Sequence, residues 1–258
     1  MDELERLSER WRQATLTKIF CRILLAGKKI IVFGEENFVR EGPNVIIGNH
    51  PGAYRDVITV LLTIPRPFFF NANKDLFYRE RINALVRKHL RRHLGRFGLL
   101  VNFLINPFKF LFADYVAPKL AAVGTIPVDL TSHDKREAIH KVQEYLKLGR
   151  LLISLQGRGR IDASEPNPYM KPFGRGISIA AYNLRVEDRM DVPITPIALF
   201  GTQRPWGVPG RILVNVGSPM FVRDYMTGGF EESVAAFRDA LQSRVHCLIL
   251  DLIKHWKE

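Results

Sequence analysis

The sequence contains only two cysteines, Cys21 and Cys247, and both lie in apolar stretches typical of helices. Together they form no metal-ligand spacing, so we interpret both as reduced packing residues, consistent with a cytosolic compartment. A Gly-x-Ser-x-Gly elbow is also missing, which argues against a hydrolase of that type. We therefore expect neither a metal nor a bound cofactor.

A secretory signal and a simple membrane-spanning helix are missing as well. Residues 1–13 are highly charged and lack the apolar core of a signal peptide. No uninterrupted run of about 18 apolar residues occurs. The nearest candidate, 98–116, contains several polar residues and Pro107, which favours an interface or a protein groove over the core of a bilayer.

The chain has 258 residues, enough for one sizeable core, with 47% apolar and 25% charged residues. Lysine and arginine total 38 against 26 acidic residues, which gives a net charge of +12. Such an excess indicates a polyanionic partner: nucleic acid, an anionic membrane, or a phosphorylated ligand such as CoA.

Short apolar runs with Gly or Pro borders alternate with helical patterns. The predicted strands are 30–33, 45–48, 67–71, 125–128, 151–155, 194–200 and 212–216. The predicted helices are 4–26, 56–63, 76–96, 134–148, 175–185 and 231–256. This alternation predicts a single α/β domain with a mainly parallel or mixed central sheet flanked by helices. We expect an N-terminal amphipathic helix in 1–27, the main domain in 28–225 and a C-terminal helix in 226–258.

Ligand sites in such folds lie beyond the carboxyl ends of the strands. The residues that follow the predicted strands are therefore the first candidates for a site. They are Asn49–His50, Lys74, Gln156–Gly157–Arg158 and Gly201–Thr202.

His50 differs from the other six histidines because it ends an apolar strand and is followed by Pro51, Gly52 and Asp56. The residue before a proline avoids helical angles, so His50 is expected to stay extended at the strand tip, with Pro51 opening the next helix. A turn can then fold Asp56 back toward the imidazole. A carboxylate on one ring nitrogen fixes the tautomer, and the other nitrogen can take a proton from an alcohol that attacks a thioester. The spacing fits equally well a histidine that only caps a helix beside a nearby acid.

Asn49, His50 and Asp56 form an Asn-His…Asp pattern, and further stretches follow it in order. In this respect the sequence resembles the glycerolipid acyltransferase superfamily, the PlsC-like or lysophosphatidic acid acyltransferase family. The resemblance covers about 28–222. The other stretches that carry it are Asn71–Phe77, Gly124–Leu130, Leu151–Arg158, Lys171–Gly176, Val192–Ala198 and Val214–Pro219.

The pattern departs from that family at three places. Five residues instead of the commoner four separate His50 from Asp56, Leu130 stands where the family has an arginine, and Gln156 stands where it has a glutamate. In the family these last two positions are thought to hold a phosphorylated acceptor. Gln156 can still hydrogen-bond but carries no charge, so either the acceptor is not a glycerol phosphate or other cations bind its phosphate.

The resemblance implies His50 and Asp56 as the catalytic pair. Predicted substrate-binding residues are Asn49, Lys74, Gln156, Gly157, Arg158, Arg160 and Lys171. Arg158, Arg160, Lys135 and Arg136 are candidates for phosphate recognition. A solvated basic turn is the alternative interpretation of Arg158 and Arg160.

Residues 79–96 contain seven Arg or Lys and one Glu, with apolar residues at helical spacing, and the Phe-rich stretch 97–112 follows. Together they predict a platform that rests on anionic lipid and admits an acyl chain. An ordinary packed helix with a solvated face is the alternative. The stretch lacks the signature of a nucleic-acid-binding module, so no nucleic-acid partner is expected.

These features lead to one main expectation and one alternative. The main expectation is an O-acyltransferase on the cytoplasmic face of a membrane, peripheral or monotopic, that moves a fatty acyl group to a lysophospholipid or related lipid hydroxyl. Its partners would be acyl-CoA or acyl-carrier protein, the lipid acceptor and the anionic membrane surface. The alternative, which Leu130 and Gln156 motivate, is a catalytically inactive lipid-binding protein on the same fold.

Overall fold

A seven-stranded sheet forms the centre of the molecule. The computed structural model describes residues 3–73, 125–128, 136–157, 159–204 and 207–257, with a few single positions between 78 and 103. Within these residues the strand order is β1-β7-β6-β2-β5-β3-β4. The strands are β1 (Lys28–Phe33), β2 (Asn44–Asn49), β3 (Phe69–Asn73), β4 (Ile126–Val128), β5 (Leu151–Gln156), β6 (Ile194–Phe200) and β7 (Gly210–Val216).

All neighbouring strands are parallel except β6 and β7, which are antiparallel. The carboxyl ends of β2, β3, β4, β5 and β6 therefore meet at one edge of the sheet, which also holds the starts of β1 and β7. This arrangement confirms the predicted α/β class with a mixed sheet.

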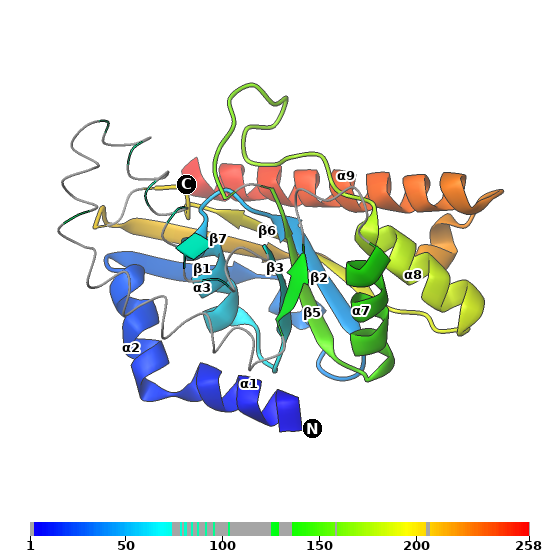
Figure 1. Cartoon of the computed structure of the whole chain (residues 1–258). Coiled ribbons are helices and arrows are strands. Elements are labelled where there is room, and N and C mark those ends of the chain that lie inside the picture. The colour runs from blue at the N-terminus through cyan, green and yellow to red at the C-terminus, as the bar shows by residue number, and fades with distance from the viewer. Residues whose placement is uncertain are drawn as a thin grey trace.

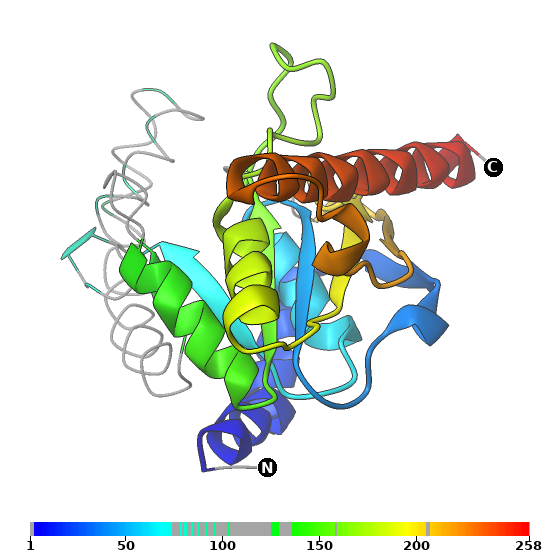
Figure 2. The same ribbon diagram turned by 90° about the vertical axis from the view of Figure 1, so that its right-hand side faces the viewer.

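Helices cover both faces of the sheet (Figures 1 and 2). Buried residues of α7, α8 and α9 pack on one face, and those of α2 and α3 pack on the other. The helices are α1 (Glu3–Gln13), α2 (Thr15–Leu24), α3 (Tyr54–Thr63), α7 (Arg136–Lys147), α8 (Gly176–Glu187) and α9 (Phe230–Lys257). The predicted helix 76–96 lies outside the described ranges except for single positions.

Strand β2 shows why the sheet needs cover on both faces. All six of its residues are buried. Val45 and Ile47 join the core beneath α7, α8 and α9, whereas Ile46 joins the core beneath α2 and α3. Successive side chains of a strand point to opposite faces, so an uninterrupted apolar run requires two cores.

The expectation of one helix over 4–26 is wrong, because the chain bends at Ala14, whose ψ is 132°. The bend separates α1 from α2 and lets Trp11 and Cys21 pack against the same core. The Ser8 hydroxyl and the Arg12 guanidinium of α1 donate hydrogen bonds to backbone carbonyls at the start of β3 and the end of α3. Tertiary contacts thus outweigh the helical propensity of this segment.

None of the helices in the described ranges is long and apolar enough to cross a membrane.

We predict that Leu252→Ala in α9 lowers the free energy of unfolding by about 2–5 kcal/mol, because it leaves a cavity in the core. Leu252 is fully buried, whereas Leu250 on the same helix is 45% exposed. Urea unfolding followed by circular dichroism measures the change, and Leu250→Ala serves as the matched control. Equal losses for the two variants would contradict the packing of α9 on the sheet.

Candidate active site

The loop that follows β2 carries the candidate site. β2 ends at Asn49, and the helix begins at Tyr54 rather than at Pro51, which corrects the expectation that Pro51 opens it. Between them the chain makes a tight turn in which the Arg55 N–H donates to the Gly52 carbonyl at 3.1 Å. Ala53 adopts φ 53° and ψ −125° in this turn. Such a conformation costs a non-glycine residue about 1–3 kcal/mol, so the surrounding structure must hold it.

The turn brings His50 and Asp56 into contact. The distance from His50 Nδ1 to Asp56 Oδ2 is 2.8 Å, and the Gly52 N–H donates to the same oxygen at 2.6 Å. The Asp56 side chain is fully buried, whereas that of His50 is 22% exposed. Asp56 also lies in the first turn of α3, where the helix dipole favours a negative charge.

This contact defines the chemistry available to the imidazole. A carboxylate only accepts hydrogen bonds when it is ionised, so Nδ1 must carry the proton that faces Asp56. In the neutral imidazole, Nε2 then has the free lone pair. A partly exposed imidazole in this tautomer can remove a proton from a ligand that reaches the edge of the sheet.

Three close backbone approaches clamp the turn. A Cβ on Gly52 would come within 2.5 Å of the Thr202 side chain, and one on Gly159 would lie 2.9 Å from Ala53 Cα. A Cβ on Gly157 would lie 3.3 Å from His50 Cβ. The loops after β5 and β6 thus pack directly on the His50 turn, and glycine is needed where they touch it.

Asn49, which was predicted to bind substrate, forms hydrogen bonds within the protein. Its side chain is fully buried. Its amide nitrogen donates to the carbonyls of Tyr169 and Leu199, and its oxygen accepts from the Leu199 N–H at 2.8 Å. These bonds tie β2 to β6, so we interpret Asn49 as a residue that positions His50 rather than one that contacts substrate.

Gln156 and Gly157 lie beside the pair. Gln156 Nε2 donates to the Ser154 hydroxyl at 2.8 Å, and its oxygen accepts from the Gly174 N–H at 3.1 Å. The amide therefore connects the end of β5 to the loop before α8. Arg160 follows in the same loop, and its Nε is buried with no hydrogen-bond partner in the described part of the chain.

Lys171, which was predicted to bind substrate, is paired with two carboxylates. Its ammonium forms ion pairs with Asp162 Oδ2 at 2.7 Å and with Glu165. The hydrogen bonds that Lys171 donates to these two carboxylates raise its own pKa, and they hold the pKa of Asp162 well below its usual range. Two carboxylates neutralise the cation, which favours a role in closing the 157–175 loop over the attraction of a phosphate.

Several predicted features lie outside the described residues. They are Lys74, Leu130, Lys135, Arg158, most of 79–96 and most of 97–112. The described ranges contain no cluster of three or more His, Cys, Asp or Glu side chains that would hold a metal. A shallow hollow lined by Glu3, Leu4, Leu7 and Arg150 lies near the start of β5, at the opposite edge of the sheet from His50.

The sequence analysis missed two residues that hold the turn. Gly159 was not identified, although a glycine two residues after Gly157 signals a second close approach. Arg55 was also missed, and its Nε donates to the Thr202 carbonyl. The only signal for Arg55 is its position beside Asp56.

Comparisons with known proteins give matches among solved structures. No protein-family model matches the chain, and no curated protein matches it. Among solved structures, four chains match. One is the crystal structure of the 1-acyl-sn-glycerophosphate (LPA) acyltransferase PlsC from Thermotoga maritima, with 16% sequence identity and a TM-score of 0.48. The match covers 95% of this chain and 79% of that one.

We predict that Gly52→Ala disrupts the His50 turn, because the new methyl group would overlap Thr202. Overpacking of this kind costs about 1–3 kcal/mol of stability. The imidazole NMR signals of His50 should shift as its contact with Asp56 changes. Gly229→Ala is the control, since a Cβ there meets nothing within 4 Å. Unchanged His50 signals in Gly52→Ala would contradict the clamp.

We predict that Lys171→Met loosens the 157–175 loop and raises amide hydrogen exchange in residues 161–172 at pH 7. In the unmodified protein the ion pair should also fail in acid. The pKa of Asp162 is lowered in the folded state, so its contribution is complete above the unfolded value of 3.8 and is lost as the pH falls through the lowered pKa. Lys147→Met removes an exposed ion pair with Asp188 and serves as the control.

Proposed function

We propose that the protein is an O-acyltransferase that moves a fatty acyl group from a thioester to a lipid hydroxyl. The observation that carries this proposal is the 2.8 Å contact between His50 Nδ1 and Asp56 at the carboxyl edge of the sheet. The Asn-His…Asp pattern and the further stretches that resemble glycerolipid acyltransferases support it.

The reaction needs one general base and no covalent intermediate on the protein. His50 Nε2 takes the proton of the acceptor hydroxyl while the oxygen of that hydroxyl attacks the thioester carbonyl carbon. The new C–O bond forms, the C–S bond breaks, and the leaving thiolate receives the proton from His50. Asp56 holds the ring in the required tautomer and stabilises the imidazolium between these steps.

The carbonyl oxygen gains negative charge as the acceptor attacks it. Backbone N–H groups near Gly157 are the proposed donors to that oxygen. The contact that supports this is the close approach of the Gly157 backbone to His50. Gln156 would act indirectly, by fixing the end of β5.

The proposed donors are acyl-CoA or acyl-carrier protein, and the proposed acceptor is a lysophospholipid or related lipid. Reaching such substrates requires a membrane surface, and we propose peripheral binding at the cytoplasmic face.

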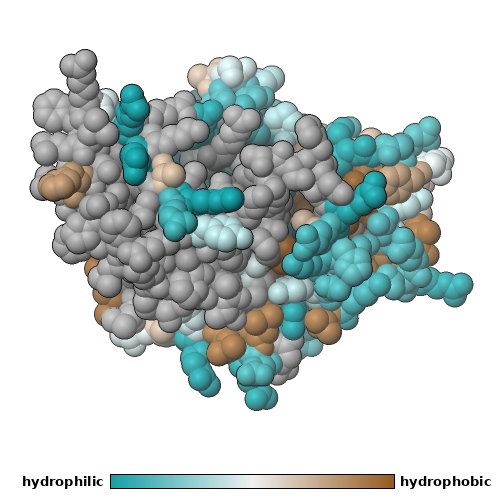
Figure 3. Space-filling model, viewed as in Figure 1, coloured by the Kyte–Doolittle hydropathy of each residue, from teal (hydrophilic) through white to brown (hydrophobic). Residues whose placement is uncertain are grey.

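Helix α2 offers a surface suited to a membrane. Ile19 and Ile23 of this helix are about half exposed, with Arg22 between them. Figure 3 shows hydrophobic residues among hydrophilic ones along the lower edge of the molecule, where α1 lies. A mixed basic and apolar surface is typical of interfacial helices.

A second candidate is a lipid-binding protein without activity. The uncharged Gln156 and the neutralised Lys171 favour it, because neither provides a free charge for a phosphorylated acceptor. This candidate predicts binding to liposomes without turnover of any acceptor.

We predict that His50→Ala lowers the rate of acyl transfer by about 10²–10⁴-fold, the usual contribution of a general base. Asp56→Asn should also lower it, because an amide does not hold the same tautomer. The assay supplies labelled acyl-CoA and a panel of lysolipids to the detergent-purified protein. His140→Ala is the control, since its side chain is 73% exposed on α7.

Two outcomes would overturn the proposal. Full activity in His50→Ala would remove the imidazole from the mechanism. Failure of the unmodified protein to acylate any lysolipid, from either acyl-CoA or acyl-carrier protein, while it still binds anionic liposomes, would favour the inactive lipid-binding protein.

A further inference from the structure

Three cations lie close together beside the His50 turn. The Arg55 guanidinium donates through Nε to the Thr202 carbonyl, and Lys28 donates to the Val208 carbonyl in the same β6–β7 connection. Lys28 lies opposite Gly210 in the pairing of β1 with β7. Arg204 is near the same glycine, because its Nη1 lies 3.5 Å from the position that a Cβ on Gly210 would take. The carboxyl edge of the sheet thus brings Lys28, Arg55 and Arg204 together from three distant parts of the chain.

The three cations carry like charges that affect one another. Partial burial, together with the positive charges of Arg204 and Arg55, lowers the pKa of the Lys28 ammonium. In the ranges that the structure describes, no carboxylate forms an ion pair with any of the three. Lys171, Arg175 and Arg223 all have such partners. Unbalanced cations repel one another, and a bound anion would remove this repulsion.

The cations are held in place by contacts that leave their charge available. Arg204 lies over the Trp256 ring at 5.3 Å. Arg211 also lies over this ring, at 5.4 Å, and donates to the Trp256 carbonyl at 2.9 Å. Arg55 bonds to the Thr202 carbonyl through Nε. Its terminal nitrogens, with an exposed Arg204, are suited to the oxygens of a phosphate.

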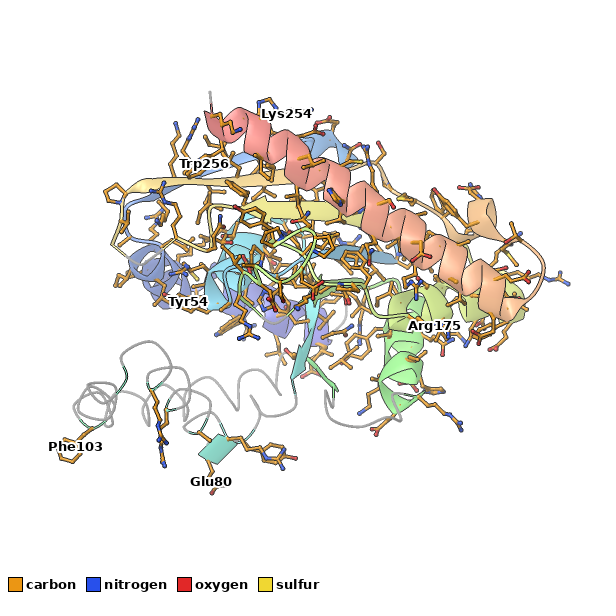
Figure 4. All side chains as sticks on the ribbon, turned by 90° about the horizontal axis from the view of Figure 1, so that it is seen from above. Tyr54, Glu80, Phe103, Arg175, Lys254 and Trp256 are labelled. Atoms are coloured by element: carbon orange, nitrogen blue, oxygen red, sulfur yellow. The ribbon has the colours of Figure 1, made fainter. Side chains whose placement is uncertain are left out.

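The cluster adjoins the proposed site rather than a remote surface. Arg55 directly precedes Asp56 and donates a hydrogen bond to the Thr202 carbonyl. Thr202 in turn packs against Gly52 of the His50 turn. Figure 4 shows Tyr54 and Trp256 toward the same end of the molecule, with Arg175 toward the other. A ligand held between Arg55 and Arg204 would therefore lie beside the turn that carries His50.

We propose that Lys28, Arg55 and Arg204 form a subsite for the phosphate group of a substrate. This deepens the proposed function, on which it rests, because both kinds of substrate carry phosphate. The phosphate would belong either to the CoA of the donor or to a lysophosphatidate acceptor. The cluster supplies the cationic character that Leu130, Gln156 and the neutralised Lys171 do not.

Binding is measured without turnover, so that the test is independent of catalysis. Isothermal titration calorimetry on the His50→Ala protein compares CoA with pantetheine, and hexanoyl-lysophosphatidate with hexanoylglycerol. Pantetheine lacks the phosphates and the adenosine of CoA, and hexanoylglycerol lacks the phosphate of the lysophosphatidate. Arg204→Gln and Lys28→Gln should each weaken binding of a phosphate-bearing ligand by about ten-fold or more, the usual effect of losing a charge-assisted hydrogen bond.

The matched control is Arg185→Gln, which removes an arginine of α8 that pairs with Asp191. Arg204 is exposed, so its replacement should leave the unfolding midpoint unchanged, and this is checked by circular dichroism. Weaker binding of CoA alone assigns the subsite to the donor, and weaker binding of lysophosphatidate alone assigns it to the acceptor.

Three results would overturn the subsite: no detectable binding of either phosphate ligand, no change on replacing the two cations, or an equal loss for the ligands without phosphate. The proposed function fails on a different result, the absence of acyl transfer by the unmodified protein. Phosphate binding can persist in that case, so the two failures are distinguishable.

Discussion

The buried carboxylate of Asp56 is the interaction on which the site depends. A charge with no exposed surface is costly unless it is hydrogen-bonded. Here one oxygen accepts from the Gly52 N–H and meets His50, while the helix dipole of α3 provides further stabilisation. The same carboxylate therefore sets the path of the turn, the start of the helix and the tautomer of the imidazole. The hydrogen bond from Gly52 to this carboxylate helps to hold Ala53 in its strained conformation.

The parallel pairing of β2 with β5 and β6 explains why other loops pack on this turn. Because β2, β5 and β6 end at one edge, the loops that follow β5 and β6 reach the His50 turn from both sides. Asn49 locks β2 to β6 just before the histidine, and Gln156 links β5 to the loop before α8. The side chains of Asn49 and Gln156, which were predicted to bind substrate, thus form contacts that support the turn. The positioning of one imidazole requires contacts from segments that are about 100–150 positions apart.

The sequence predicted what depends on local pattern and missed what depends on distant contacts. All seven strands were found because uninterrupted apolar runs bordered by Gly or Pro are a local signal, and His50 and Asp56 were found because they share one turn. The bend at Ala14 was missed because no proline or glycine marks it; the packing of Trp11 and Cys21 on one core decides it. The ion pairs of Lys171 were not foreseen because a motif gives residue types, whereas the carboxylates that neutralise it are brought to it by the fold of its own loop.

The distribution of ion pairs separates two kinds of cation in a chain with a net charge of +12. Lys171 has its carboxylates within the 157–175 loop, so any anionic ligand would have to displace two fixed partners. Lys28, Arg55 and Arg204 are anchored by backbone carbonyls and by Trp256, which orient them without cancelling their charge. Anchoring by neutral groups lowers the entropic cost of binding and keeps the electrostatic attraction. For this reason an excess of basic residues identifies an anion site only when the partners of each cation are known.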